Sequence, residues 1–197
     1  MYDYVFETDN EFEIPLLKES LQVKAIELPF EKWGYIGRGK YMPGTYHFYT
    51  DDYKFDAVWK KPDKLLESQC SGTVEVNFST NNQMPFSEGL HRIYKKRWLS
   101  RFWQLHNIPI CVDLCVSDKF VQLNLLGIPK GWKSYCTRSV SHNSTGFIER
   151  DYNIACNHAE STDILFVVYG GGKIIKDYCK QNGFLHILEN SRRVDNG

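Results

Sequence analysis

The sequence has no excess of charge of either sign, no low-complexity linker and no long apolar run. Lysine plus arginine and aspartate plus glutamate number 24 each, so no long-range field draws the protein toward nucleic acid or an anionic membrane. This balance still leaves room for a local basic patch. No stretch approaches the roughly 18 apolar residues of a membrane span, and residues 1–13 are acidic and aromatic, unlike a secretory signal. We therefore expect a cytoplasmic protein without a membrane partner.

The sequence also lacks the short motifs that identify common sites. It contains no phosphate loop, no dinucleotide-binding fingerprint and no nucleophile elbow. Its six cysteines do not form the two close Cys/His pairs that usually hold zinc. Because most of the cysteines lie in apolar segments, we expect reduced thiols in the core and no metal site built from them. The sequence does not identify a cofactor, and a divalent metal is the candidate.

What the sequence does contain is a regular alternation of strand-like and helix-like segments. The segments typical of strands are Val23–Leu28, Thr45–Tyr49, Thr73–Phe78, Ile110–Val116, Trp132–Val140, Asp163–Tyr169 and Phe184–Leu188. The segments with helical spacing are Tyr53–Ser68, Phe86–His106, Gly146–His158 and Lys173–Gln181, with a short helix after Ser117.

This alternation predicts an α/β fold with right-handed crossovers and a mostly parallel sheet. About six or seven strand–helix units fit, fewer than a full eight-fold barrel of about 250 residues needs. We expect a small, incomplete barrel, and the alternative is an open, doubly wound sheet. A single domain over residues 14–190 is predicted, with an N-terminal extension (1–13) and a polar tail (191–197).

In either architecture, ligands bind beyond the carboxyl ends of the strands. Reading off those ends gives Asp52, Asn77, Asp113 and Arg138 as candidate catalytic residues. The acids could transfer protons or, with Asp51, hold a divalent metal. The alternative for Asp51 or Asp52 is an N-cap of the following helix. Asp113 lies inside an apolar strand and therefore needs a partner, such as Arg138 or a cluster of backbone groups.

Two further patterns suggest binding. Gly170, Gly171 and Gly172 join a buried strand to a helix and precede Lys173, so their amides could cradle a phosphate. A tight turn without a ligand is the stronger alternative.

The second pattern is a basic and aromatic helix. Lys95, Lys96, Arg97 and Arg101 lie on it together with Trp98, and a basic stripe with stacking aromatics can track a nucleic-acid backbone. We expect Lys95 and Lys96 on the polar face and Trp98 packed inward. A solvated helix face is the alternative.

Several of these motifs resemble a phage- and plasmid-borne family, domain of unknown function 4417. The matching motifs are Ile14-Pro-Leu-Leu-Lys18, His47-Phe-Tyr-Thr-Asp-Asp-Tyr53, Trp59-Lys-Lys-Pro62, Asn77-Phe-Ser79, Tyr94-Lys-Lys-Arg-Trp98, Phe102-Trp-Gln104 and Gly127-Ile-Pro-Lys130. The resemblance runs from about Ile14 to about Glu189 and implies a mobile-element or viral origin, but no reaction. The family usually has aspartate where Asn77 stands and a glycine-rich turn at Thr137–His142, so a metal or base role at position 77 is in doubt.

Three functional hypotheses follow. The first is a phage or plasmid protein of a nucleic-acid transaction such as replication, with Lys95, Lys96, Arg97, Arg101 and Lys173 on the backbone. The second is an enzyme acting on a small or phosphorylated substrate at the strand ends. The third is a non-catalytic protein that binds a host protein. In each case the location expected for a phage protein is the host cell cytoplasm.

Overall fold

The computed structural model describes residues 4–34, 40–139 and 145–189. Within these ranges seven short strands form one sheet, every neighbouring pair is parallel, and the strand order follows the chain. The strands are β1 (Phe30–Lys32), β2 (Thr45–His47), β3 (Gly72–Val74), β4 (Ile110–Asp113), β5 (Ser134–Arg138), β6 (Leu165–Tyr169) and β7 (Leu185–Ile187). The predicted α/β fold with a parallel sheet is therefore confirmed.

Helices connect the strands. The α-helices are α1 (Asp56–Lys60), α2 (Phe86–Leu105), α3 (Val121–Asn124), α4 (Gly146–Ala159) and α5 (Lys173–Asn182). The 3-10 helices are η1 (Glu19–Leu21), η2 (Asp52–Lys54), η3 (Pro62–Ser68) and η4 (Asp118–Phe120). None of the helices in the described residues is both long enough and apolar enough to span a membrane.

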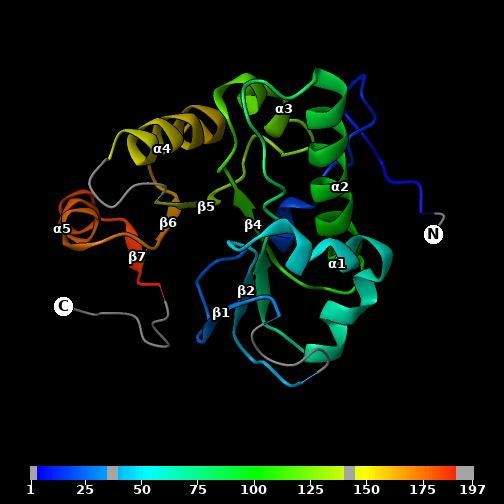
Figure 1. The fold of residues 1–197 in the computed structure, drawn as a ribbon, viewed down its shortest axis with the longest axis horizontal. Coiled ribbons are helices and arrows are strands. Elements are labelled where there is room, and N and C mark those ends of the chain that lie inside the picture. Colours follow the sequence, from blue (N-terminus) through cyan, green and yellow to red (C-terminus); the bar gives the residue numbers. More distant parts are fainter. Residues whose placement is uncertain (1–3, 35–39, 140–144, 190–197) are drawn as a thin grey trace.

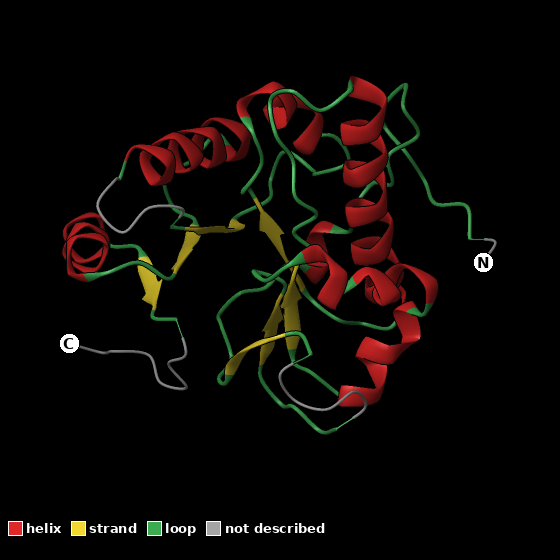
Figure 2. Ribbon diagram, viewed as in Figure 1, coloured by secondary structure: helices red, strands yellow, loops and turns green. Residues whose placement is uncertain are grey.

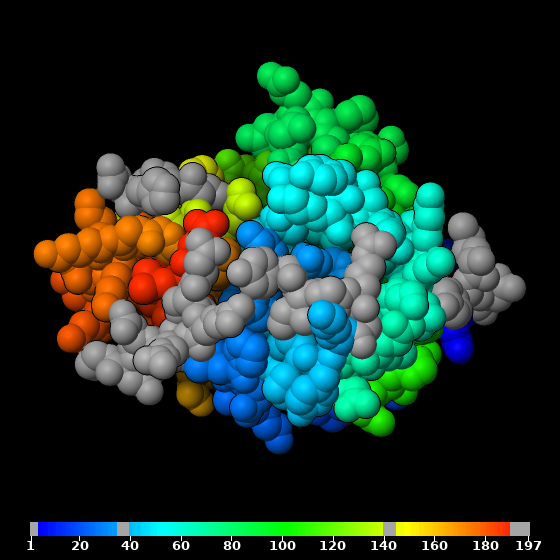
Figure 3. All heavy atoms as spheres, turned by 60° about the horizontal axis from the view of Figure 1, so that its bottom comes forward, coloured from blue at the N-terminus to red at the C-terminus, as the bar shows by residue number. Residues whose placement is uncertain are grey.

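The sheet curls into a nearly closed barrel with a seam between β1 and β7, which lie at the two ends of the strand order. Figures 1 and 2 show α1 and α2 outside one part of the sheet and α4 and α5 outside the other. In Figure 3, N-terminal segments (blue) lie beside the C-terminal ones (orange and red). The rings of Phe30 in β1 and Tyr169 in β6 are 5.9 Å apart between centroids, so an aromatic contact links strands from opposite ends of the chain. The expectation of a small, incomplete barrel is confirmed.

Two hydrophobic clusters lie on the two faces of the sheet. The inner cluster draws only on strand and loop residues, among them Tyr49, Cys111, Cys136 and Tyr169. The outer cluster joins strand residues to residues of α2, α4 and α5. Cys111 belongs to the inner cluster and Val112 to the outer one, as expected when successive side chains point to opposite faces of a strand. All six cysteines are free, and four of them are buried.

One predicted strand is wrong. Val23–Leu28 contains no strand, and the first strand begins only after Pro29, at Phe30. The segment contacts the sheet through single hydrogen bonds, from Val23 N to Ile110 O (3.0 Å) and from Thr45 N to Glu27 O (2.9 Å), next to a bridge from the preceding Gln22 to Ile110. A short apolar run can pack against a barrel end without joining its ladder, and periodicity alone does not separate these two cases.

The helix predicted over Tyr53–Ser68 is not continuous. The structure has three short helices there, η2, α1 and η3. Pro62 lies at the start of η3, where the missing N–H costs no hydrogen bond. The predicted N-terminal extension packs on α2 in its described part, with the Phe6 and Trp98 rings 5.6 Å apart. The predicted tail, 191–197, lies outside the described residues.

Candidate functional site

A pocket of about 300 Å³ opens at the carboxyl ends of three neighbouring strands. From β3, β4 and β5, or from the residues just after them, come Asn77, Ser79, Ser117, Thr137 and Arg138. From α4, which follows β5 in the chain, come Phe147, Arg150 and Asp151. Parallel strands bring their carboxyl ends to one edge, so residues from distant parts of the chain meet there.

Two residues that line this pocket each have a polar atom without a hydrogen-bond partner among the described residues. Ser117 Oγ and Arg138 Nε are both buried, and no described residue binds either of them. Buried polar atoms in folded proteins are almost always paired, and an unpaired one costs about 1–3 kcal/mol. Ser117 and Arg138 line the same pocket, so a molecule bound there is a candidate partner for both side chains.

Asp151 is the acidic group of the pocket. It is buried, and it accepts hydrogen bonds from the Thr137 hydroxyl and from Arg150 Nε and Nη2 (2.9 and 2.7 Å). Burial raises the pKa of Asp151 to about 6, against the lowering effect of the Thr137 hydrogen bond and the Arg150 charge. A carboxyl group with that pKa exchanges protons readily near neutral pH.

Arg150 is held in place by acceptors around the pocket. Besides Asp151 it binds the Val116 carbonyl oxygen (3.1 Å) and forms an ion pair with Asp118. Two carboxylates therefore share its charge. Arg138 differs, because no carboxylate among the described residues forms an ion pair with it.

Asp113, predicted as a catalytic residue, lies outside the lining of this pocket and is fully buried. Its carboxylate accepts from Tyr49 Oη (2.9 Å), Asn77 Nδ2 (2.9 Å) and the Cys115 amide (3.1 Å). It also forms an ion pair with Lys96 Nζ at 2.8 Å. Of the two kinds of partner suggested for it, Arg138 is wrong, whereas the backbone does supply one donor, the Cys115 amide.

Asn77 connects this buried carboxylate to the pocket. Its Nδ2 donates to Asp113 Oδ2 and to the Cys115 carbonyl oxygen, at 2.9 and 3.0 Å. Both are acceptors, so the orientation of the amide is fixed. An ionised aspartate at position 77 could not donate to Asp113, and the two carboxylates would repel each other.

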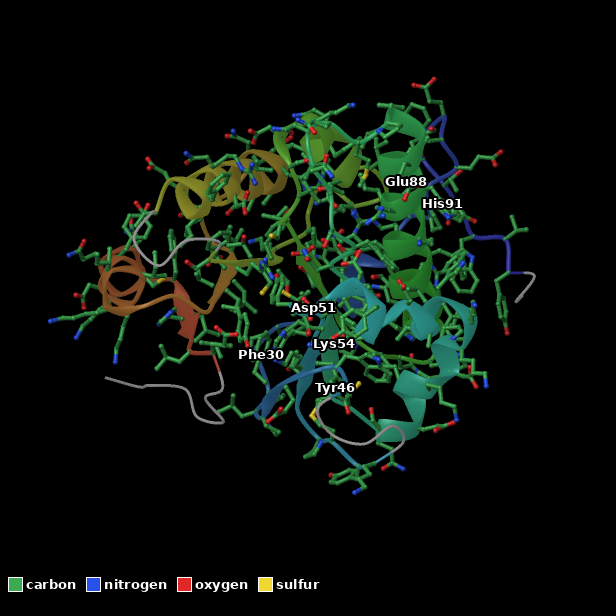
Figure 4. All side chains as sticks on the ribbon, viewed as in Figure 1. Phe30, Tyr46, Asp51, Lys54, Glu88 and His91 are labelled. Carbon is green, nitrogen blue, oxygen red and sulfur yellow. The ribbon has the colours of Figure 1, made fainter. Side chains whose placement is uncertain are left out.

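Asp52, the remaining acidic candidate, holds the loop after β3. It accepts from the Ser79 amide and hydroxyl (3.1 and 2.7 Å) and from Arg92 Nη1 (3.1 Å). Asp51 occupies the N-cap position of η2 without a side-chain cap bond and forms an ion pair with Lys54 at 2.9 Å (Figure 4). Asp52 and Asp113 thus bind different partners, and the described residues contain no group of three metal-ligating side chains.

The exposed basic stripe expected on α2 is wrong for two of its members. Lys96 and Arg97 are 2% and 0% exposed. Arg97 forms an ion pair with Glu75 of the segment after β3, and Lys96 also donates to the Asp113 carbonyl oxygen and to Asn124 Oδ1. Two carboxylates buried beside the sheet need cations, and α2 turns this part of its surface toward them.

The other members of the stripe are only partly exposed. Lys95 Nζ lies 4.3 Å from the Phe78 ring centroid, and burial lowers its pKa. Arg101 lies over the Phe6 ring at 5.1 Å. Glu88 and His91, labelled in Figure 4, are on the same helix, so its surface carries mixed charge.

The glycine turn has a conformational explanation. Gly170 and Gly171 have φ of +78° and +89°, which side chains rarely tolerate, and a Cβ on Gly171 would meet Ile175 at 2.7 Å. Gly172 is the N-cap of α5, and Lys173 is exposed. Phosphate binding by this turn stays a prediction.

The residues of α4 were missed by the sequence reasoning. Strand ends can be read from a sequence, but Phe147, Arg150 and Asp151 enter the pocket from the helix after β5. The sequence feature that could have identified them is the pair of adjacent charged residues, Arg150 and Asp151, among apolar neighbours on a predicted helix.

Comparison with known proteins identifies the family of this chain. The family model described as "Domain of unknown function (DUF4417)" matches residues 6–168. The Gene 1 protein of Mycobacterium phage L5 is 29% identical over 130 residues, which cover 64% of this chain and 56% of that protein. The Gene 1 protein of Mycobacterium phage D29 is 29% identical over 133 residues, covering 64% and 48%. The chain thus spans about half the length of these curated relatives. No solved structure matches it.

Proposed function

Because this chain belongs to the DUF4417 family and is similar to phage proteins, we propose that it is a phage enzyme acting on a small anionic substrate in the strand-end pocket. The observation that carries the proposal is that Arg138 and Ser117 both line this pocket and that each has a buried polar atom, Arg138 Nε and Ser117 Oγ, without a partner among the described residues. A guanidinium donates to a phosphate or carboxylate, and the serine hydroxyl can donate to the same group.

The charge of the lining supports an anion. Arg138 and Arg150 contribute two positive charges, against one acidic group, Asp151. Since Arg150 is shared with Asp151 and Asp118, Arg138 is the cation available to the substrate. A phosphate or carboxylate at Arg138 would compensate a charge that the described part of the protein leaves unpaired.

Asp151 is the group we assign to proton transfer. With its pKa raised to about 6, it is a mixture of acid and base near neutral pH. The Thr137 hydroxyl and the Arg150 guanidinium hold its carboxyl group in one orientation. A substrate anchored at Arg138 would therefore react beside a positioned acid–base group.

The binding step can be tested with inorganic phosphate by isothermal titration calorimetry. Arg138→Gln should weaken phosphate binding about 10- to 100-fold, as expected for a charge-assisted hydrogen bond. Lys173→Ala, which removes an exposed lysine beside the glycine turn, is the control and should leave the affinity unchanged. If Lys173→Ala weakens binding and Arg138→Gln does not, the anion site lies at the glycine turn and this proposal is wrong.

The catalytic step needs a substrate screen. Phosphorylated small molecules would be incubated with the protein and followed by phosphorus NMR. For any substrate turned over, Asp151→Asn should abolish turnover while leaving binding intact. Turnover retained by Asp151→Asn would contradict its role.

A nucleic-acid transaction is the second candidate, and the observation behind it is the set of basic residues on α2 and beside the glycine turn that are not buried. Three of its five predicted contacts are not buried, namely Lys95, Arg101 and Lys173. Filter binding to single- and double-stranded DNA at 50 and 200 mM salt would test it, since backbone contacts make affinity fall steeply with salt. DNA binding that weakens in a Lys95→Ala/Lys173→Ala variant would support this candidate. If neither phosphate nor DNA binds, both candidates are wrong.

A further inference from the structure

Phe147 is an exposed aromatic ring at the edge of the pocket. It lies in the first turn of α4, lines the pocket and is 46% exposed. The Arg150 guanidinium lies over the ring, 5.2 Å from its centroid. Since Arg150 is itself fixed by Asp118, Asp151 and the Val116 carbonyl, the ring has a firm support on that side.

The part of Phe147 that faces solvent has no ring packed against it among the described residues. Phe86, which is exposed to a similar extent (47%), instead contacts the Phe12 ring at 6.2 Å. An exposed aromatic ring beside a polar pocket offers a surface on which a flat ring can stack. The pocket therefore combines a cationic part, at Arg138, with a flat apolar part, at Phe147.

Asn77 adds a hydrogen-bond acceptor. Both hydrogens of its amide nitrogen are used by Asp113 and Cys115, so Oδ1 is the atom left for a ligand. An acceptor held in one orientation selects ligands that carry an N–H or O–H group. At about 300 Å³ the pocket is at the small end of the range for small-molecule sites, roughly 300–1,000 Å³.

We propose that the pocket takes a single nucleotide, with its phosphate at Arg138 and its base stacked on Phe147. This inference rests on the proposed anion site and names its substrate class. A nucleotide supplies the anion for Arg138, a flat ring for Phe147, and base or sugar donors for Asn77. The small volume favours one nucleotide over a dinucleotide cofactor.

The experiment compares ligands that differ by one part. Titration calorimetry on the full chain would use inorganic phosphate, ribose 5-phosphate and the four nucleoside monophosphates. At least one nucleoside monophosphate should bind more tightly than ribose 5-phosphate. Phe147→Ala should weaken that nucleotide about 5- to 100-fold, the effect of losing a base–aromatic stack, and leave ribose 5-phosphate unchanged. Phe147→Trp should retain nucleotide binding.

Phe86→Ala is the matched control, because it removes a ring of equal exposure from another helix, and it should not change nucleotide affinity. The inference is overturned if ribose 5-phosphate binds as tightly as every nucleotide, or if Phe147→Ala weakens both ligands equally. Either result leaves phosphate binding at Arg138 standing. Failure of the anion site itself would give a different result: Arg138→Gln would then leave the binding of both phosphate and nucleotide unchanged.

Discussion

Replacing Lys96 by methionine should destabilise the protein far more than the same replacement at Lys95. The Lys96 ammonium group donates to Asp113 Oδ2, to the Asp113 carbonyl oxygen and to Asn124 Oδ1. Its three hydrogens are thereby used, and both ionic partners are buried. Methionine keeps most of the side-chain volume but leaves the Asp113 carboxylate without its cation.

The magnitude follows from the burial. Breaking a buried ion pair by removing one partner costs about 3–5 kcal/mol. For a domain of this size each kcal/mol lowers Tm by about 2–4 °C, so Lys96→Met should lower Tm by about 6–20 °C. Lys95→Met, whose ammonium group lies over the Phe78 ring, should cost no more than about 1 kcal/mol.

Urea denaturation of both variants would measure these costs. A double variant, Lys96→Met/Asp113→Asn, removes both charges and should recover more than half of the lost stability, because no ion is then left unpaired. Equal stability of Lys96→Met and Lys95→Met would refute the buried pair. So would a double variant that is as unstable as the sum of its single changes.

The remaining predictions concern Asp151 and Gly89. The folded state raises the pKa of Asp151 from 3.8 to about 6, so it binds that proton more tightly than the unfolded state does. The free energy of unfolding should therefore fall by about 3 kcal/mol as pH rises from about 4 to about 6, and Asp151→Asn should flatten this slope in urea denaturation at each pH. Gly89→Ala would place a Cβ 2.2 Å from the Phe120 ring. It should cost about 1–3 kcal/mol in thermal unfolding despite the better helix propensity of alanine, and Phe120→Leu in the same chain should restore part of the loss.

Much of the fold can be predicted from the sequence because its signals are local. The apolar runs at Ile110 and Asp163, and the helical spacing from Phe86 onward, depend on residues only a few positions apart. Alternation of such segments leads to parallel strands, and parallel strands lead to a site at their carboxyl ends. Asn77 and Arg138 were placed in the pocket by that reasoning.

The partners of the charged residues could not be predicted in the same way. Lys95, Lys96 and Arg97 are adjacent in the chain, yet only the last two turn toward buried carboxylates. Helical spacing identifies a polar face, but it does not say whether solvent or a carboxylate covers that face. The expected basic stripe failed for this reason.

By itself, the sequence determined the alternation of strands and helices from Thr45 onward, and with it the parallel sheet and the edge where a site forms. Only the tertiary structure decided that Asp113 is closed off by Lys96 and Tyr49, and that α4 brings Phe147 and Asp151 to the strand ends. The physical reason is distance along the chain. Secondary structure depends on neighbouring residues, whereas pairing of buried charges depends on groups that meet only when the whole sheet has closed.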